Sequence, residues 1–382
     1  MLCERKDCTG CFACQNICPK KCIDFIPDDK GHVYPYINKD ICINCGLCSK
    51  VCPSLNAVEQ KYPITAFASW ALNDTERKTS TSGGVASVFS RKVLKNNGVV
   101  FGASIGNGLI VKHIMIEKES DLYKLKGSKY VHSYIENSFS LAKEKLDLGI
   151  QVLFIGTPCQ IAGLRKYLRK EYSNLLTVDI ICHGVPSQQM LHEEAKGLDV
   201  DRFTFRDENG YNMQFYKGTK SISCKPMPKS FYLSAFMKGI TCRESCHTCS
   251  YANEKRVSDI TIGDFWGLGE LKNASKEVQK GISVILPITE KGLSFVNTCS
   301  NDLFLEERAV EEAVQGNGQL KHPSKSDQGR DIFNQLYPNN TFEFSVKKAT
   351  KYYSIKNIII RRIYANPKLL DSLRSVKRKV LK

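Results

Sequence analysis

The sequence predicts an α+β protein in which a small cysteine-rich domain precedes an α/β domain with a mixed sheet and a basic helical tail. Eight of the ten cysteines in the first 52 residues form two copies of one spacing. Short β-branched segments then alternate with helix-like segments up to about residue 310. Twelve Lys or Arg and one Asp occupy the last 36 residues. We therefore expect three parts: residues 1–58, residues 63–340 (an N-terminal part 63–146 and a C-terminal part 147–340) and residues 347–382.

The N-terminal cysteines have the spacing of a dicluster ferredoxin. Each copy reads Cys-x2-Cys-x2-Cys-x3-Cys-Pro. In two-cluster ferredoxins the fourth cysteine of each run binds the other cluster. The sequence therefore predicts two [4Fe–4S] clusters, one held by Cys8, Cys11, Cys14 and Cys52 and the other by Cys42, Cys45, Cys48 and Cys18. A pair of zinc sites is the alternative, but zinc has no need of a crossed fourth cysteine.

The α/β domain is predicted element by element. The expected strands are Thr65–Trp70, Val99–Ile105, Leu109–Ile116, Gln151–Ile155, Leu175–Ile181, Asp259–Ile262 and Ile282–Pro287. The expected helices run from Ser82-Gly83-Gly84 to about Asn96, over Cys159–Tyr167 and over Gly292–Cys299. Pro158 suits a first helical turn. Residues 315–329 are polar and rich in glycine, which favours a loop.

Five further cysteines lie where such a fold binds ligands. Cys159 and Cys182 each follow a predicted strand, at the edge where α/β sheets place ligands. The other three, in one compact loop, are Cys242, Cys246 and Cys249. Four of the five could hold a third [4Fe–4S] cluster.

A second interpretation of these five cysteines stays open at this point. Cys159 and Cys182 could be buried apolar residues, as free cysteines commonly are. The loop cysteines could then bind zinc with His247 or Cys224. The remaining cysteines outside any such spacing, which we expect to be structural, are Cys3, Cys22, Cys224 and Cys299.

Several stretches together resemble the family of the coenzyme F420-reducing hydrogenase beta subunit, which includes plant 7-hydroxymethyl-chlorophyll reductase. The matching stretches are Ser82-Gly83-Gly84, Lys126-Gly127-Ser128-Lys129-Tyr130, Gly156-Thr157-Pro158-Cys159-Gln160, Cys182-His183-Gly184, Cys246-x2-Cys249 and Arg256-x2-Asp259-Ile260-x-Ile262-Gly263-Asp264. The resemblance covers roughly residues 63–340. It implies a flavoprotein that holds FAD beside a third [4Fe–4S] cluster. The cluster ligands would be Cys159, Cys182, Cys246 and Cys249, with Cys242 as an alternative ligand.

The resemblance also implies residues for the flavin site. They are Ser82, Gly83, Gly84, Lys126, Ser128, Lys129, Tyr130, Thr157, Arg256, Asp259 and Asp264. The Gly83-Gly84 turn lets backbone N–H groups approach a phosphate at a helix N-terminus, although an ordinary helix entry would look the same. Lys126 and Lys129 could neutralise a pyrophosphate or be solvated surface charges. His183 is a candidate catalytic proton donor, or else a structural histidine. Neither a GxGxxG fingerprint nor a P-loop is present.

These features predict an oxidoreductase that passes electrons between the N-terminal clusters, a third cluster and FAD, because a flavin converts between two-electron and one-electron chemistry. The expected partners are a small-molecule substrate and an electron donor or acceptor such as ferredoxin, F420 or a reductase. The alternative is an electron-transfer subunit without its own substrate site. A third interpretation, an iron–sulfur sensor that binds nucleic acid, is disfavoured because no DNA-binding motif is evident.

The N-terminus has no apolar signal segment, and no apolar run is long enough to span a bilayer. We therefore expect a cytoplasmic protein. The tail mixes apolar and basic residues at near-helical spacing over Ile355–Tyr364 and Leu369–Leu381. Such helices could contact the inner membrane face peripherally, or simply pack on the main body.

Overall fold

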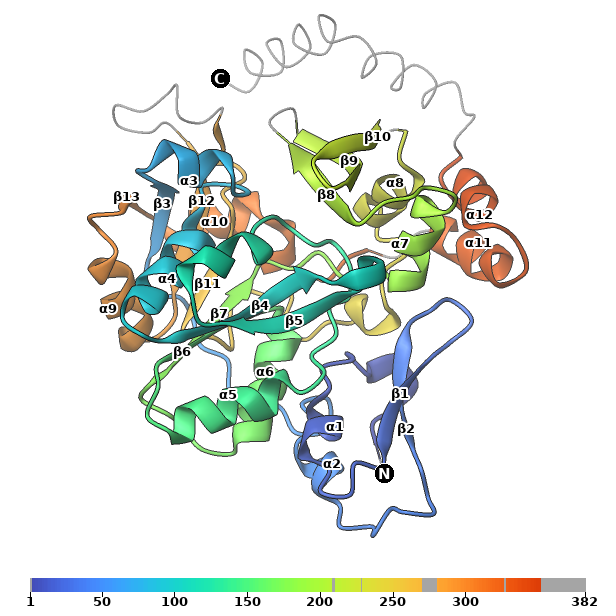
Figure 1. Ribbon diagram of the computed structural model, residues 1–382, viewed down its shortest axis with the longest axis horizontal. Coiled ribbons are helices and arrows are strands. Elements are labelled where there is room, and N and C mark those ends of the chain that lie inside the picture. Colours follow the sequence, from blue (N-terminus) through green and yellow to red (C-terminus); the bar gives the residue numbers. More distant parts are fainter. Residues whose placement is uncertain (1, 208–209, 228, 270–279, 326–327, 352–382) are drawn as a thin grey trace, which may run out of the picture.

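The computed structural model describes residues 2–207, 210–227, 229–269, 280–325 and 328–351 (Figure 1). It confirms the α+β class, with a small N-terminal region below a larger α/β body (Figure 1). The two tail helices predicted within residues 352–382, and with them the proposed membrane contact, lie outside the described residues. Within the described ranges, no helix has both the length and the apolar character needed to cross a bilayer.

The α/β body is built on an eight-stranded mixed sheet. Its strand order is β13-β3-β12-β11-β7-β6-β4-β5, and β4, β6, β7 and β11 are parallel neighbours. The strands are β3 (Ala66–Ala71), β4 (Val99–Ile105), β5 (Val111–Ile116), β6 (Val152–Gly156), β7 (Leu175–Ile180), β11 (Ile260–Asp264), β12 (Ser283–Pro287) and β13 (Leu303–Arg308). All seven predicted strands are confirmed, with ends that move by one or two residues. β13, at the sheet edge, was not predicted.

Helices cover both faces of this sheet. On one face lie α4 (Val85–Lys95) and α9 (Glu290–Thr298), and on the other α5 (Ser138–Asp147) and α6 (Pro158–Leu168). The longer helices away from this sheet are α7 (Gln188–Ala195), α11 (Gln328–Leu336) and α12 (Phe342–Ala349). Thr157 caps α6 in a capping box with Gln160, and Pro158 fills its first turn as predicted. The predicted loop at 315–329 contains the end of α10 (Val310–Gly316), a 3-10 turn (Gly318–Leu320) and the start of α11. The rest of its described residues are irregular, as predicted.

A second sheet was not predicted from the sequence. It is antiparallel and has the order β10-β9-β8, formed by β8 (Arg202–Asp207), β9 (Gly210–Lys217) and β10 (Lys220–Pro226). Its buried Phe203, Phe205 and Phe215 pack with α7, α8 (Phe231–Met237) and the C-terminal helices in one hydrophobic cluster. This unit closes one side of the cleft described below.

The N-terminal region shares a core with the α/β body. It contains two short helices, α1 (Ala13–Ile17) and α2 (Leu47–Lys50), and a hairpin of β1 (Ile23–Pro27) and β2 (Val33–Ile37). Phe12 and Ala13 are buried in the same cluster as Phe139 of α5 and Ile161 of α6. The region therefore obtains from α5 and α6 the apolar burial that its own short sequence cannot supply.

Candidate redox site

The first group of cysteines brings together residues from both N-terminal runs. Cys8, Cys11, Cys14 and Cys52 are each at most 9% exposed. Burial raises the pKa of Cys11 to about 12, with the charges of Cys8 and Cys52 contributing to this rise. Burial likewise raises the pKa of Cys14, and the charges of Cys11, Cys8 and Cys52 contribute to this rise. These four thiols therefore lie close enough to interact, as the crossed assignment requires.

The second group lies beside the first. Cys18, Cys42 and Cys48 pack against buried Cys22 and Ile23, and Cys45 is exposed. The charge of Cys48 also raises the pKa of Cys14, so the two groups lie next to one another. Such proximity is what electron transfer between two clusters needs.

The third group lies in the α/β body. Cys159 stands in the first turn of α6, and Cys182 follows β7. The short 3-10 turn Glu244–Cys246 ends at Cys246, three residues before Cys249. Burial raises the pKa of Cys182, and the charges of Cys246, Cys159 and Cys249 add to the rise. Buried thiols of raised pKa become thiolates only beside a strong positive charge, which a metal centre supplies. The donor set therefore fits a metal cluster.

Cys242 stands slightly apart from this third group. Its Sγ donates to the carbonyl of His183 at 3.7 Å, and Cys246 is the one cysteine whose charge acts on its buried thiol. The charge interactions thus group Cys159, Cys182, Cys246 and Cys249, and Cys242 joins them only through Cys246. Among the described residues, no three His, Cys, Asp or Glu side chains are grouped tightly enough to hold a single metal ion. Four thiolates around a four-iron cubane stand farther apart.

A long cleft runs along the carboxyl ends of the parallel strands. Of the residues predicted to bind cofactor or to act on substrate, the cleft is lined by Ser82, Gly84, Lys126, Ser128, Lys129, Tyr130, Thr157, His183 and Asp264. Cys159 and Cys182 line it as well. So does Thr9, which lies between Cys8 and Cys11. The first and third cysteine groups therefore both border this cleft.

Two helix N-termini open onto the cleft. Gly84, at φ +81°, precedes α4, and Val85, Ala86 and Ser87 of its first turn line the cleft. Thr157 at the start of α6 lines it from another side. The unpaired backbone N–H groups and the dipoles of helix N-termini favour anions such as phosphate. The cleft thus has two places suited to a pyrophosphate.

The two predicted lysines differ in their partners. Lys126 Nζ is paired with Glu76 Oε1 at 2.7 Å and donates to Thr79 Oγ1 at 2.7 Å. Lys129 Nζ donates only to the carbonyls of Leu125 and Lys126, each at 2.8 Å, among the described residues. Burial lowers the pKa of Lys129 to about 7. Lys129 is therefore the lysine whose charge a bound phosphate would stabilise most.

Aromatic and charged side chains line another part of the cleft. Tyr130 stacks on Phe236 with ring centroids 5.1 Å apart, and Trp266 is 44% exposed. Arg206 Nη1 pairs with Asp264 Oδ2 at 2.7 Å. Burial lowers the pKa of His183, which the charge of Asp264 raises in part. Planar rings and a neutral histidine suit an aromatic cofactor.

Three predicted cofactor residues do not line the cleft. Arg256 is buried and pairs at 2.8 Å with Asp179, which lies on the central strand β7. Asp259 accepts hydrogen bonds from Thr177 and Thr289. A Cβ on Gly83 would lie 2.3 Å from the carbonyl oxygen of Ser69, so this glycine is required by strand packing. Their positions support a role in shaping the site instead of contacting the cofactor.

Other residues in these sites gave no signal in the sequence. Arg206 and Tyr211 reach the cleft from the unpredicted sheet. Cys3 and Cys22, predicted to be structural, interact with cysteines of the first two groups. Cys52 and Cys8 raise the pKa of the Cys3 thiol, and the sulfurs of Cys18 and Cys22 are 3.3 Å apart. No spacing rule covers either cysteine, because both lie outside the repeated runs.

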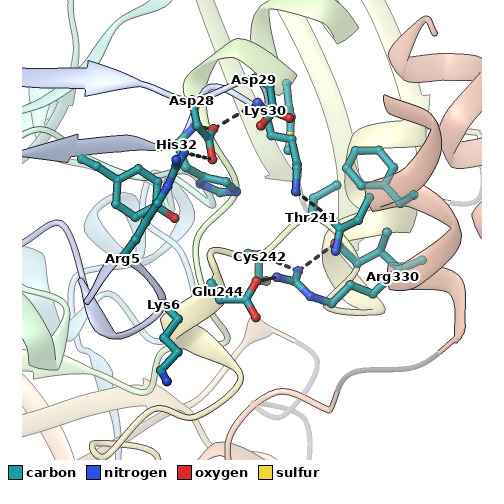
Figure 2. A pocket seen from close by; sticks show the side chains of 15 residues that line it. Arg5, Lys6, Asp28, Asp29, Lys30, His32, Thr241, Cys242, Glu244 and Arg330 are labelled. Atoms are coloured by element: carbon teal, nitrogen blue, oxygen red, sulfur yellow. Dashed lines mark hydrogen bonds and ion pairs between the residues drawn. The ribbon is translucent and has the colours of Figure 1, made fainter. Parts of the chain in front are cut away.

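A second pocket, of about 410 Å³, lies between the N-terminal hairpin and the α/β body (Figure 2). Asp28, Lys30 and His32 enter it from the hairpin, and Thr241 and Arg330 from the opposite wall (Figure 2). Lys30 Nζ donates to Asn334 at 3.2 Å, and Arg330 Nη2 to Glu244 at 2.9 Å. Lys30 thus has a partner across the junction, and Arg330 has one within the α/β body.

Comparisons with known proteins agree with these assignments at domain level. Residues 150–313 match the family model for the C-terminal part of the beta subunit of coenzyme F420 hydrogenase/dehydrogenase. Residues 7–56 and 34–92 match two models of a 4Fe-4S dicluster domain.

Two curated relatives are similar over most of the chain. The coenzyme F420-dependent sulfite reductase of Methanocaldococcus jannaschii is 28% identical over 336 residues, which are 82% of this chain and 48% of that protein. The chain thus spans about half of that relative. A subunit of the F(420)H(2) dehydrogenase of Methanosarcina mazei is 22% identical over 67% of this chain and 75% of that protein.

Among solved structures, a chain of the F420-reducing [NiFe] hydrogenase complex from Methanosarcina barkeri is similar with a TM-score of 0.47 and 17% identity, over 81% of this chain and 95% of that one. The family assignment rests on the sequence matches. The chain therefore joins an N-terminal 4Fe-4S dicluster domain to a domain of the family described as the C-terminal part of the coenzyme F420 hydrogenase/dehydrogenase beta subunit.

Proposed function

We propose that this iron–sulfur electron-transfer protein is a flavin-dependent oxidoreductase with a third [4Fe–4S] cluster. The observation that carries the proposal is the meeting of three elements at one cleft. Thr9, which lies between Cys8 and Cys11, lines the cleft. Cys159 and Cys182 of the third group line it as well, and so does the buried Lys129. A cofactor in this cleft would lie beside two cysteine groups.

FAD, when bound, would supply the exchange between two-electron and one-electron chemistry. The residues of this chain would hold it. The N-termini of α4 and α6 and the ammonium of Lys129 would bind the pyrophosphate. Tyr130 and Phe236 would offer a ring surface, and Arg206, fixed by Asp264, would keep a positive charge near it. His183, held mostly neutral by burial, would accept or donate a proton on the substrate side.

The positions of the three cysteine groups suggest an order for the proposed clusters, but they do not identify the substrate. The second group lies at an exposed rim, the first borders the cleft, and the third lies in its wall. We propose that electrons travel through the three groups in this order or its reverse. F420, ferredoxin or a reductase would exchange electrons with the chain, and a small molecule would react at the cleft.

A second candidate function is a relay subunit without its own substrate. It is favoured by the relative named as a subunit of F(420)H(2) dehydrogenase. Turnover by the purified chain alone separates the two, because a relay subunit needs its partner to react with substrate.

The proposal is tested by counting cofactors after anaerobic reconstitution. We expect about twelve irons, four for each of three cubanes, and one FAD per chain. A double variant, Cys246→Ser with Cys249→Ser, should lose about four irons and slow flavin reduction by the remaining clusters. A wild-type chain with about eight irons and no flavin would refute both the third cluster and the flavin site.

A further inference from the structure

The most deeply buried large charged side chain described is Arg243. It is 0% exposed and belongs to the loop between Cys242 and Cys246. Its Nε donates to the carbonyl of Cys8 at 2.6 Å, and its Nη2 donates to the carbonyl of Val33 at 2.8 Å. Its guanidinium carbon lies 4.1 Å from the ring centroid of Tyr34. A residue of the third cysteine loop thus lies directly under the first cysteine group.

Two further contacts hold Arg243 in this position, one at its side chain and one at its backbone. A Cβ on Gly10 would lie 3.2 Å from Arg243 Cζ, so the Cys8–Cys11 loop is closely packed on it. The backbone N–H of Arg243 donates to the carbonyl of Val185 at 3.0 Å. The position of the charge is therefore set from both the N-terminal domain and the α/β body.

Arg243 has no carboxylate partner among the described residues, and its Nη1 has no hydrogen-bond partner there. The other deeply buried arginines of this region differ. Arg256 pairs with Asp179, and Arg330 pairs with Glu244. A buried charge without a counter-charge is costly, so a fold that retains one needs a negative group nearby.

A cluster at the first cysteine group would be that negative group. A cubane held by four thiolates is a net anion, and each reduction adds one negative charge. The charge of Arg243 acts on the thiols of both Cys8 and Cys246. A fixed cation beside a cluster favours the reduced form, because attraction grows as the cluster becomes more negative.

We infer that Arg243 is the internal counter-cation of the first cluster and a positioning residue that raises its reduction potential above that of the second cluster. The inference rests on the proposed cluster ligands, and it adds a direction to the relay. One electron leaves the second cluster, which is oxidised, and enters the first, which is reduced. Electrons in the relay would therefore reside preferentially on the first cluster, which lies nearer the cleft than the second.

The test is a potentiometric titration of the reconstituted full-length chain, followed by electron paramagnetic resonance. The signal of the first cluster is assigned by its loss in Cys11→Ser. In Arg243→Gln we expect at least a tenfold fall in the equilibrium constant for reducing this cluster, which corresponds to 59 mV for a one-electron couple. The potential of the second cluster should stay unchanged. Arg243→Lys, which keeps the charge, should restore most of the shift.

Ser245→Ala is the matched control. Ser245 Oγ donates to the same Cys8 carbonyl at 3.1 Å, so its loss removes a contact at that position without removing a charge. Its effect on the potential should be small. An Arg243→Gln chain with full iron content and an unmoved first potential would overturn the inference, and so would equal shifts of both clusters.

If Arg243→Gln cannot be loaded with iron, Arg243→Lys decides the question. A loaded lysine variant with a potential near that of the wild type supports the counter-cation, and failure of both variants to load overturns it, because the charge alone would then not suffice. None of these readouts requires flavin or substrate. A missing flavin would therefore refute the proposed function and leave this result standing.

Discussion

Gly163 of α6 lies against Cys11 so closely that a Cβ atom on the glycine would be 3.1 Å from the cysteine sulfur. Cys159 stands four residues earlier on the same helix, and positions four apart share one helix face. Tyr251 is buried between the groups, since the charges of Cys159, Cys11, Cys249 and Cys52 all act on it. One helix flank thus supports both the first and the third cysteine groups.

Gly163→Val should damage the first cluster, because its side chain would displace Cys11. We expect a loss of iron or a broadened signal from that cluster, and slower transfer to the cleft. Gly163→Ala should have a weaker effect in the same direction. Gly106→Ala is the control, since its Cβ would meet only ordinary contacts. Unchanged cluster spectra in Gly163→Val would show that this close approach has no consequence.

Cys52→Ser should remove the first cluster although it lies in the second cysteine run. The reason is the burial of Cys52 among the thiols that act on Cys11 and Cys14. Cys48→Ser should instead remove the second cluster, and exposed Cys224→Ser should change neither. Iron content and resonance spectra of the three variants decide this. If Cys52→Ser and Cys48→Ser lose the same signal, the ligands are not crossed.

Cys249→Ser and Cys242→Ser should behave differently. Cys249 is one of the four thiols whose charges interact, whereas Cys242 donates to the carbonyl of His183. We expect Cys249→Ser to lower the iron content by one cluster and Cys242→Ser to keep it. Iron and sulfide analysis after anaerobic reconstitution provides the measurement. The reverse result would make Cys242 the ligand.

Lys129 should make flavin binding depend on pH. Burial lowers its pKa to about 7, so in the free chain it is charged below that pH and neutral above it. A bound phosphate favours the charged form and raises this pKa. Affinity for FAD should therefore be highest below about pH 7 and should fall as the pH rises through that value.

Fluorescence titrations of FAD from about pH 6 to about pH 9 would check this dependence. Lys129→Met should abolish the slope and weaken binding. Lys126→Met is the matched control: its charge is paired with Glu76, so the slope should persist. A slope that survives in Lys129→Met would assign it to another group.

Asp179→Ala should destabilise the whole α/β body. Asp179 is 0% exposed and accepts from Arg256 at 2.8 Å and from Thr261 at 2.7 Å. Its removal leaves a buried arginine without its carboxylate, which costs about 3–5 kcal/mol. Denaturant unfolding measures the loss. Asp199→Ala, which breaks the exposed pair with Lys217, should have little effect, and an equal loss in both would contradict the argument.

The sequence predicted the parts of the site that follow local rules. Pro158 and Cys159 lie at the start of a helix after a strand because capping and proline geometry are local. The cysteine spacing likewise led us to expect thiols of both runs in one group. Gly83 and Arg256 were expected at the cofactor, and the structure gives them packing and ion-pair partners instead. A motif shows that a residue type is required without showing whether a ligand or the fold requires it.

The unpredicted parts depend on contacts between residues far apart in sequence. The sheet β8–β10 has short, partly polar strands whose register is fixed by the helices packed behind them. Arg243 lies 235 residues from Cys8, and nothing near it in sequence indicates their contact. Pairings of this kind are decided by tertiary packing, which periodicity does not encode.

The shared burial of Phe12 and Ala13 with α5 and α6 bears on how the protein matures in the cell. A ferredoxin joined by a free tether could receive its iron at any time and swing between partners. Here the N-terminal segment contributes to a hydrophobic core that is complete only when the later-synthesised helices α5 and α6 pack against it. Iron delivery is therefore a folding step for the entire polypeptide. A cell short of iron would accumulate chains with an open flank, exposed to proteolysis and aggregation.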